Sequence, residues 1–431
     1  MYSISKRSTL NGNITVPGSK SHTIRAVLLA AMAEGTSIIH NPLTSNDCIS
    51  ALEAARAFGA KVTEEAGKWI VEGMGYNIHV PQNFIDTGNS GTATYFVAAI
   101  AAICDGYTFI TGDHQIRRRP IKPLINALNE VGAEAYITSP DSEAPPIIVK
   151  GKMTGGKVYF SGFTSQFISS IMIASPMAEK RTEIFVENPL EKPYLQMTID
   201  WMKRYGITLA ENTGDYTYFA VDGGQLYKAA ENIVPSDWSG VAFPLVAAVT
   251  TPSNVVINGV DFNDSQGDKD VVDHLIAMGA DIVKDINNNC IIIKGGKPLH
   301  GGLTINLNDI PDSLPALSVA ACYANGDTTF TGLAHVRVKE TDRVAVMEEE
   351  LTKLGANIET GPDYMIIHGG QKLKGGLVES HDDHRIAMAL TVAGLFSDEE
   401  VQVNEAQCAS VSFPGFYDLM KTIGANISMK E

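Results

Sequence analysis

The chain has 431 residues, 44% of them hydrophobic, so it can bury two or three cores of domain size. Its formal net charge of −16 argues against nucleic acid as the main partner, because phosphate backbones bind basic surfaces. No apolar run reaches the ~18 residues of a membrane span, residues 1–7 hold no signal-peptide core, and five scattered cysteines suit a reducing compartment. We therefore expect a cytoplasmic protein that binds neither membrane nor nucleic acid.

A short pattern recurs six times along the chain: an apolar residue, a glycine, a small or branched residue, a spacer and another apolar residue. A stretch with helical spacing precedes each copy, and alternating residues follow it. Since glycine readily takes the left-handed conformation that ends a helix, each copy predicts a helix followed by a strand. The glycines lie 69 to 76 residues apart and are Gly59, Gly132, Gly206, Gly279, Gly355 and Gly424.

A second strand and a turn follow most copies, as at residues 147–151, 291–296 and 365–370. The period is too long for the usual solenoids, whose repeats run about 20–50 residues. We therefore predict an α/β protein built from six copies of one β-α-β-α-β-β unit.

Six short islands of charge, hydroxyl groups and glycine interrupt this pattern. The first, residues 17–25, carries Lys20, Ser21 and Arg25 before an apolar run that is typical of a buried helix. A helix N-terminus attracts anions, and the two cations would add full charges. A nucleotide phosphate loop is excluded, because Ser19 separates Gly18 from Lys20.

The next three islands also precede predicted helices. Residues 86–92 place Asn89 and Gly91 in a turn where a ligand could approach the backbone closely. In residues 113–120, Pro120 is predicted to start a helix, which would hold Arg119 at the N-terminus of that helix. Residues 162–167 offer hydroxyl and amide groups suited to a phosphate or polyol, although Thr164 could also serve only as a helix cap.

The last two islands are the most highly charged. In residues 337–343, Lys339 and Arg343 are four apart, which predicts a shared helix face; a surface ion-pair network is the alternative. Residues 380–385 contain Asp383, His384 and Arg385 at a predicted helix start, where aspartate is a common cap. No second histidine-rich cluster has ligand spacing, so we predict no metal and no cofactor. An acidic chain that gathers cations in this way is expected to bind a small polyanion.

The islands occur in the order found in the 5-enolpyruvylshikimate-3-phosphate synthases, and the chain resembles that family from about residue 10 to residue 420. The resemblance implies a two-domain inverse α/β barrel with three repeats in each domain. Residues 1–20 with 237–431 would form one domain, residues 21–236 would form the other, and the active site would lie in the cleft between them.

The resemblance also implies the reaction, which transfers a carboxyvinyl group from phosphoenolpyruvate to the 5-hydroxyl of shikimate 3-phosphate in a monomeric enzyme. Asp312 would accept the hydroxyl proton, and Glu340 would give and remove the C3 proton, with Lys20 and His384 as helpers. Asn89 is included among the substrate contacts. Shikimate 3-phosphate would be held by Ser21, Arg25, Thr164, Ser165, Gln166, Tyr194 and Lys339, and phosphoenolpyruvate by Lys20, Gly91, Arg119, Arg343 and Arg385.

Four positions depart from the pattern of the family. Tyr95 stands where arginine is usual, and Val411 stands where well-studied members have lysine. Glu191 stands near the position of a serine that helps bind the sugar phosphate, and His335 replaces a frequent asparagine. The loss of two cations weakens the predicted phosphoenolpyruvate end, while the acid–base set is intact.

Two other functions remain open. An enolpyruvyl transferase acting on UDP-N-acetylglucosamine shares the fold and chemistry, but the loop cysteine usual in that family is missing between His114 and Arg119. A non-catalytic phosphosugar-binding homologue is supported only by Tyr95 and Val411.

Overall fold

The computed structural model describes residues 1–162 and 164–431. All six repeat glycines have positive φ, between 83° at Gly206 and 115° at Gly59. At each of them the amide of the residue after the glycine bonds back across the cap, for example Ala60 N to Ala55 O at 3.1 Å and Ala356 N to Leu351 O at 3.0 Å. Each predicted glycine cap is therefore confirmed, with the hydrogen bonds of a Schellman motif.

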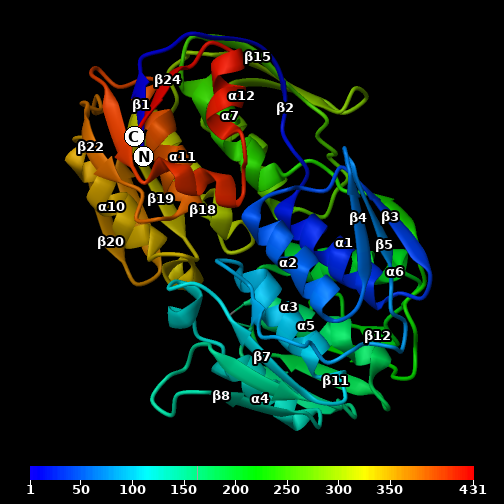
Figure 1. Ribbon diagram of the computed structural model, residues 1–431. Helices are drawn as coiled ribbons and strands as arrows, with labels where there is room; N and C mark the ends of the chain where they lie inside the picture. Colours follow the sequence, from blue (N-terminus) through cyan, green and yellow to red (C-terminus); the bar gives the residue numbers. More distant parts are fainter. Residues whose placement is uncertain (163) are drawn as a thin grey trace. The chain divides into compact units, whose positions relative to one another are not determined.

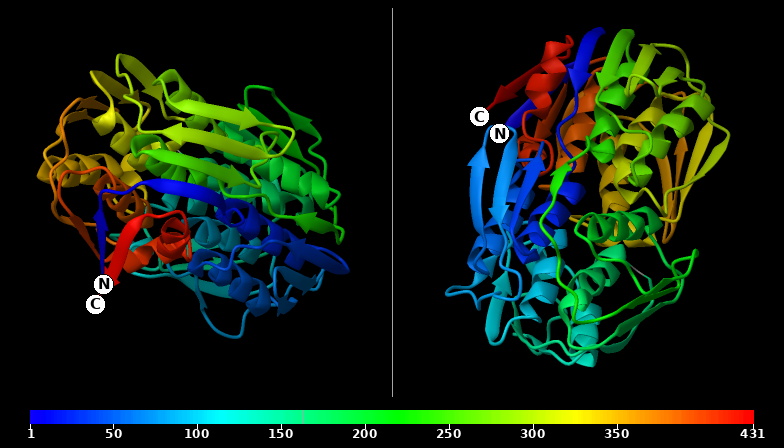
Figure 2. Two further views of the ribbon diagram at one scale, coloured as in Figure 1. Left: turned by 90° about the horizontal axis from the view of Figure 1, so that it is seen from above. Right: turned by 90° about the vertical axis from the view of Figure 1, so that its right-hand side faces the viewer.

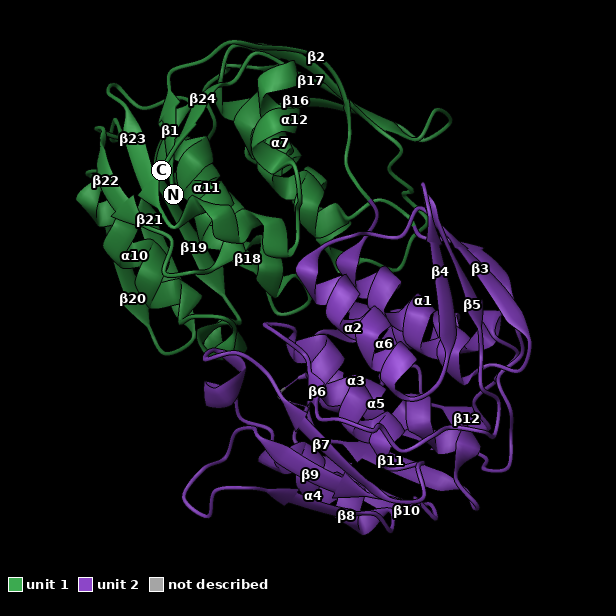
Figure 3. Cartoon of the chain, viewed as in Figure 1, with its two compact units in different colours: residues 1–17, 235–431 green, residues 18–234 purple. Residues whose placement is uncertain are grey.

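The chain divides into two compact units, residues 18–234 and residues 1–17 with 235–431, coloured separately in Figure 3. Each unit holds three repeats, and the labels below are those of Figure 1.

In the unit 18–234 the first repeat consists of β14 (Glu231–Ile233), α1 (Lys20–Met32), β3 (Thr36–His40), α2 (Asn46–Ala57), β4 (Lys61–Glu65) and β5 (Lys68–Glu72). The second consists of β6 (Ile85–Asp86), α3 (Gly91–Ala101), β7 (Tyr107–Thr111), α4 (Lys122–Glu130), β8 (Glu134–Ile137) and β9 (Ile147–Lys150). The third consists of β10 (Gly156–Phe160), α5 (Ser165–Ala174), β11 (Thr182–Val186), α6 (Lys192–Arg204), β12 (Glu211–Asn212) and β13 (Tyr218–Val221).

In the other unit the fourth repeat consists of β2 (Leu10–Thr15), α7 (Trp238–Thr250), β15 (Ser253–Asn258), α8 (Val271–Ala277), β16 (Asp281–Asp285) and β17 (Cys290–Gly295). The fifth consists of β18 (Leu303–Asn306), α9 (Leu314–Tyr323), β19 (Asp327–Thr331), α10 (Arg343–Lys353), β20 (Asn357–Gly361) and β21 (Tyr364–His368). The sixth consists of β22 (Gly376–Glu379), α11 (His384–Gly394), β23 (Val401–Asn404), α12 (Phe416–Thr422), β24 (Asn426–Lys430) and β1 (Tyr2–Lys6).

Each repeat forms a four-stranded sheet of the same topology within the described residues. The first two strands of a repeat pair in parallel, and the remaining pairings are antiparallel, giving orders such as β6-β7-β9-β8 and β18-β19-β21-β20. The predicted β-α-β-α-β-β unit is thus confirmed in all six copies.

Three repeats take a strand from a distant part of the chain. β14 pairs with β3, and β2 pairs with β15, so each supplies the first strand of a repeat whose other elements lie far away in sequence. β1 completes the sixth sheet between β23 and β24, which brings the two termini side by side (Figure 2).

The first helix of each repeat is the buried one. Every residue of α7 is buried, and α1, α3, α5, α9 and α11 are buried over most of their length. The second helices cover the outside of this core and are amphipathic. For example, α10 exposes Glu349 and buries Leu351. The first helices therefore form the centre of each unit, with the sheets around them. Within the described residues, no helix combines the length and apolar composition needed to span a membrane.

Candidate active site

Most of the predicted site residues lie at or beside helix N-termini. Lys20 begins α1, Gly91 begins α3, Ser165 begins α5, Arg343 begins α10 and His384 begins α11. The N–H groups of a helix's first turn have no acceptor within the helix, and they create a partial positive charge at its N-terminus. The sequence therefore places its cations where the backbone already favours anions.

In the unit 1–17 with 235–431, the guanidinium of Arg343 is buried among three carboxylates. Its Nη1 donates to Asp312 Oδ1 at 2.8 Å, its Nη2 to Glu340 Oε2 at 2.6 Å and its Nε to Asp383 Oδ2 at 2.8 Å. Burial opposes the charge, but Asp383, Glu340 and Asp312 outweigh it and raise the pKa of Arg343. One permanent cation thus holds both predicted acid–base carboxylates.

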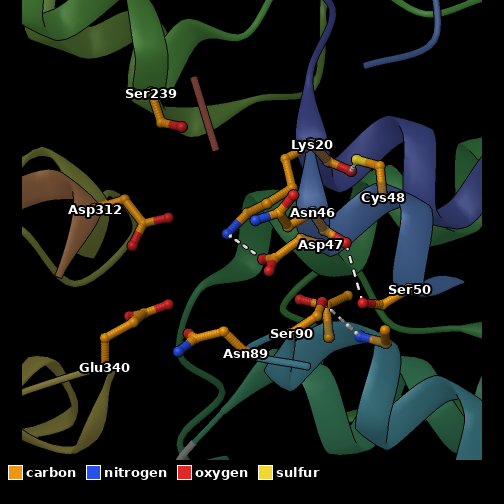
Figure 4. A network of polar contacts seen from close by, with 12 residues as sticks. Lys20, Asn46, Asp47, Cys48, Ser50, Asn89, Ser90, Ser239, Asp312 and Glu340 are labelled. Atoms are coloured by element: carbon orange, nitrogen blue, oxygen red, sulfur yellow. Dashed lines mark hydrogen bonds and ion pairs between the residues drawn. The ribbon is translucent and has the colours of Figure 1, made fainter. Parts of the chain in front are cut away.

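Asp312 is also bound by a second buried arginine. The Nη2 atom of Arg385 donates to Asp312 Oδ2 at 2.9 Å and to Ser239 Oγ at 3.1 Å. Burial and the charge of Arg343 oppose the charge of Arg385, but the carboxylates of Asp312, Asp237 and Asp268 together outweigh them and raise the pKa of Arg385. Figure 4 shows the carboxylates of Asp312 and Glu340 near each other.

Asp383 combines a structural and an electrostatic task. It caps α11 by accepting from the Arg385 amide at 2.9 Å, as predicted, and it also accepts from Thr341 Oγ1 at 3.1 Å and from Arg343. Because Asp383 is fully buried, removal of Arg343 would leave its charge without its main partner.

The predicted shared helix face of Lys339 and Arg343 is wrong. The helix α10 begins only at Arg343, with Asp342 as its cap, while Lys339 ends the short helix η5 (Ala334–Val338) in a non-helical conformation. Arg337 pairs with both oxygens of Asp342, at 2.8 and 3.0 Å, and holds this bend. The cap at Asp342 stops the helical spacing from extending back to Lys339.

In the unit 18–234, Lys20 forms an ion pair with a buried carboxylate. Its Nζ lies 3.0 Å from Asp47 Oδ2 at the start of α2, as drawn in Figure 4. Lys20 is therefore held in place by a residue that the sequence did not single out.

Arg25 is fully buried one turn further along α1. It donates to Thr198 Oγ1 at 2.9 Å, to Ser21 O at 3.1 Å and to Tyr194 O at 3.3 Å, and it lies 5.0 Å from the Phe96 ring centroid. Burial lowers the pKa of Arg25 to about 10 in spite of Tyr194 and Glu191, so it remains charged at neutral pH. It ties α1 to α6 and sets the position of Tyr194.

Asn89, Gly91 and Arg119 meet at the start of α3. Arg119 Nη2 donates to Asn89 Oδ1 at 3.4 Å, and Asn89 in turn donates to Asp113 Oδ2 at 2.7 Å. A Cβ atom on Gly91 would lie only 2.6 Å from Arg119 Nη1, so the guanidinium packs directly on the glycine. The predicted helix start at Pro120 is wrong by two residues, because α4 begins at Lys122.

The N-terminus of α5 binds a carboxylate of the same chain. Thr164 caps the helix by accepting from Gln166 N, as the capping interpretation predicts. The Thr164 and Ser165 hydroxyls and the Ser165 amide all donate to Glu191 Oε2, while Gln166 Nε2 donates to Thr92 Oγ1 at 2.8 Å. Three predicted binding residues are thereby gathered at one helix start.

One group of described residues has the geometry of metal ligands, namely Glu349, Glu350 and His381, whose ligand atoms lie within 4.8 Å of one another. The ammonium of Lys353 lies 2.9 Å from Glu349 and 2.8 Å from Glu350, so a protein cation already neutralises these carboxylates. We assign no metal to this group.

Comparison with known proteins decides the family. The family described as EPSP synthase (3-phosphoshikimate 1-carboxyvinyltransferase) matches residues 4–420. Relatives named 3-phosphoshikimate 1-carboxyvinyltransferase include one from Ruminiclostridium cellulolyticum, 43% identical over 98% of this chain and 99% of that protein. Another, from Methanocaldococcus jannaschii, is 39% identical over 99% of both chains.

The chain belongs to the EPSP synthase family. A solved EPSP synthase from Acinetobacter baumannii has the same fold, with a TM-score of 0.83 at 28% identity over 100% of this chain and 99% of that chain. Membership confirms the predicted inverse α/β barrel and the predicted activity, which is enolpyruvyl transfer in the shikimate pathway.

The four departures from the EPSP synthase pattern have different surroundings. Tyr95 is buried and meets Phe167 edge to face, with ring centroids 4.9 Å apart, so it joins α3 to α5. His335 is buried within η5, and Val411 is half-buried at the end of the short helix η6 (Ala406–Val411). Tyr95 therefore has a packing role, whereas Glu191 makes polar contacts with predicted site residues.

The sequence did not reveal several residues that contact the candidate site. Asp47 and Asp268 carry no local motif, and Asp383 was noticed only as a cap. Asp268 lies beside the candidate base Asp312 only in the folded chain, where Ser313 Oγ donates to Asp268 Oδ1 at 2.7 Å.

Asp268→Asn is expected to change the pH dependence of stability. Burial is the main cause that raises the pKa of Asp268 from 3.8 to about 7, and the charges of Asp312 and Asp237 raise it further. Arg385 and Ser313 act in the opposite direction. Charging Asp268 in the fold is unfavourable, so its contribution to the free energy of unfolding falls as pH rises from about 4 to about 7. The gain in stability of Asp268→Asn over the natural protein should therefore grow across that range in urea unfolding. A pH-independent difference would contradict this.

Gly91→Ala is expected to displace Arg119. The added Cβ cannot coexist with Nη1 at 2.6 Å, and the flexible guanidinium is the part that can move. Because Arg119 is predicted to hold phosphoenolpyruvate, the KM for phosphoenolpyruvate should rise roughly tenfold, which is equivalent to about 1.4 kcal/mol. Thermal stability should change little. Gly214→Ala is the control, because nothing lies within 4 Å of that Cβ position. Equal kinetics for both variants would show that Arg119 does not contact this substrate.

Proposed function

We propose that this chain transfers the carboxyvinyl group of phosphoenolpyruvate to the 5-hydroxyl of shikimate 3-phosphate, with Asp312 and Glu340 as its acid–base residues. C3 of phosphoenolpyruvate gains a proton, and the hydroxyl oxygen attacks C2 while losing its own proton. The tetrahedral intermediate then loses phosphate and one C3 proton, which regenerates the double bond. The observation that carries the proposal is Arg343, whose guanidinium holds both Asp312 and Glu340.

In this proposal Arg343 links substrate binding to acid–base chemistry. The carboxylate of phosphoenolpyruvate would compete with Asp312 and Glu340 for the guanidinium hydrogens of Arg343, with Arg385 as the second cation. As the substrate takes these hydrogens, Asp312 would become available for the 5-hydroxyl and Glu340 for C3. His384 and Lys20 would assist these proton transfers, and Lys20, Gly91 and Arg119 would contact the phosphate group.

Shikimate 3-phosphate would be bound mainly by residues around α5 and α6. Thr164, Ser165 and Gln166 lie at the start of α5, and Tyr194 lies in the first turn of α6, where Arg25 holds its backbone. Ser21, Asn89 and Lys339 would complete the substrate contacts. Both substrates are anions, which gives the gathered cations and helix N-termini a common task. Bringing the two reactants together could supply roughly 7–11 kcal/mol of the barrier reduction.

The test is phosphate release by the purified protein. We expect release from phosphoenolpyruvate when shikimate 3-phosphate is present and none when UDP-N-acetylglucosamine replaces it. A chelator should leave the rate unchanged, since we propose no metal. Release only with UDP-N-acetylglucosamine would favour the other transferase, and binding of shikimate 3-phosphate with no turnover would favour a non-catalytic homologue. The monomeric state, the cytoplasmic location and the lack of nucleic-acid and membrane binding stay predictions, to be tested by light scattering, fractionation and binding assays.

A further inference from the structure

The side chain of Glu191 is a buried anion inside the proposed sugar-phosphate site. Only 2% of the residue is exposed, and one oxygen, Oε2, accepts from Thr164 Oγ1 at 3.2 Å, Ser165 N at 3.0 Å and Ser165 Oγ at 2.8 Å. The backbone of Glu191 has φ 53° and ψ 40°, a left-handed conformation that glutamate seldom adopts. The carboxylate thus takes hydrogen bonds from two residues that are proposed to bind a phosphate.

A substrate phosphate and this carboxylate need the same donors. Each hydroxyl and each amide has one hydrogen to donate, and here all three are directed at Glu191. A phosphate that approached without displacing the carboxylate would place two anions side by side, and their repulsion is stronger in a buried site than in water. The buried cation Arg25 already interacts electrostatically with Glu191. The phosphate must therefore compete with a resident anion.

We propose that Glu191 is a specificity-determining residue that occupies the hydrogen-bond donors of the sugar-phosphate subsite. Glu191 lowers the affinity for shikimate 3-phosphate. It thereby reduces the ratio of the affinity for shikimate 3-phosphate to the affinity for unphosphorylated shikimate. The inference rests on the proposed function, because Thr164 and Ser165 are assigned there to shikimate 3-phosphate. Binding of phosphoenolpyruvate is not affected by Glu191.

A purely structural role predicts different behaviour. If Glu191 served only to hold the start of α5, its replacement would loosen that helix and weaken every acceptor. As a competing anion, its replacement frees donors for the phosphate and strengthens only the phosphorylated acceptor. Two replacements separate these cases: Glu191→Gln keeps the shape and removes the charge, and Glu191→Ser also shortens the side chain. Glu187→Gln is the matched control, because Glu187 lies exposed on the same connection between β11 and α6.

The experiment is calorimetric titration of the natural protein and the three variants with shikimate 3-phosphate and with shikimate. Glu191→Gln and Glu191→Ser should bind shikimate 3-phosphate about tenfold more tightly or better, equivalent to 1.4 kcal/mol. Shikimate affinity and the KM for phosphoenolpyruvate should change less than about threefold, and Glu187→Gln should match the natural protein. Unchanged or weaker binding of shikimate 3-phosphate in both folded Glu191 variants would overturn the proposal.

A measurement on the natural protein keeps the proposal testable if the variants do not fold. Its affinities for shikimate 3-phosphate and shikimate should differ by less than about a hundredfold, and a larger ratio would overturn the proposal. These titrations do not depend on turnover. A protein that binds shikimate 3-phosphate as described but releases no phosphate would refute the proposed function and leave the inference about Glu191 in place.

Discussion

Arg343→Ala is expected to lower kcat/KM for phosphoenolpyruvate by roughly 30- to 4,000-fold, because truncating a buried charge that pairs with an anion costs ~2–5 kcal/mol. The loss should exceed the effect on shikimate 3-phosphate binding, since Arg343 is proposed to hold the phosphoenolpyruvate carboxylate. Steady-state kinetics with each substrate varied in turn, together with calorimetry for shikimate 3-phosphate, would measure both effects. Equal weakening of both ligands would show that Arg343 does not distinguish the two substrates.

The same substitution should also destabilise the fold. Without the guanidinium, the buried Asp383 and the half-buried Glu340 and Asp312 lose their shared partner, and breaking the buried pair with Asp383 costs about 3–5 kcal/mol. Arg343→Lys keeps the charge but cannot bridge three carboxylates at once, so we expect an intermediate loss in urea unfolding. The exposed ion pair of Arg7 with Asp398 supplies the control, Arg7→Ala, with a loss within about 1 kcal/mol. Similar losses in Arg343→Ala and Arg7→Ala would contradict the buried network.

Asp312→Asn is expected to lower kcat by roughly 10²- to 10⁴-fold, the usual contribution of a general base. The one carbonyl oxygen of asparagine can still accept from Arg343 or from Arg385, but the side chain cannot take the proton of the 5-hydroxyl. The KM values should change much less than kcat, because the binding cations remain. Asp327→Asn is the control, since that carboxylate lies on the exposed side of β19. A kcat within about threefold of the natural value in Asp312→Asn would assign the base role to another residue.

The fold could be predicted from the sequence because its signal is local. Gly206 and the other five glycines end their helices within one turn, so the left-handed cap can be recognised without knowledge of distant contacts. The repeat at Gly206 also shows the limit of the pattern. Its alternating residues predict a strand immediately after the cap, but Ile207 and Leu209 lie outside any strand and β12 covers only Glu211–Asn212.

Long-range pairing within the units was harder to predict. β14 and β2 each complete a repeat from a distant part of the chain, and the sequence contains nothing that fixes which parallel neighbour they select. Parallel pairs form between strands separated by long connections, so their partners follow from the packing of the whole unit.

The candidate site was predicted as residues but not as a network. The cations were recognisable because they stand in islands at helix starts, as with Lys20 and Arg343. Their partners Asp47 and Asp383 come from other helices, 27 and 40 positions away, and only the folded chain brings them together. Glu191 looked like a simple departure from the family pattern until its contacts with Thr164 and Ser165 gave it a physical role.

The central claim is that the chain forms a new carbon–oxygen bond between the two substrates, and nuclear magnetic resonance of the reaction in deuterated water tests it most directly. We predict a product that carries a carboxyvinyl ether on the 5-oxygen of shikimate 3-phosphate, with deuterium incorporated at the vinyl carbon derived from C3 and one phosphate released for each ether formed. Incorporation should be strongly reduced in Asp312→Asn. Release of phosphate with pyruvate as the only organic product, or no reaction with both substrates present, would contradict the account.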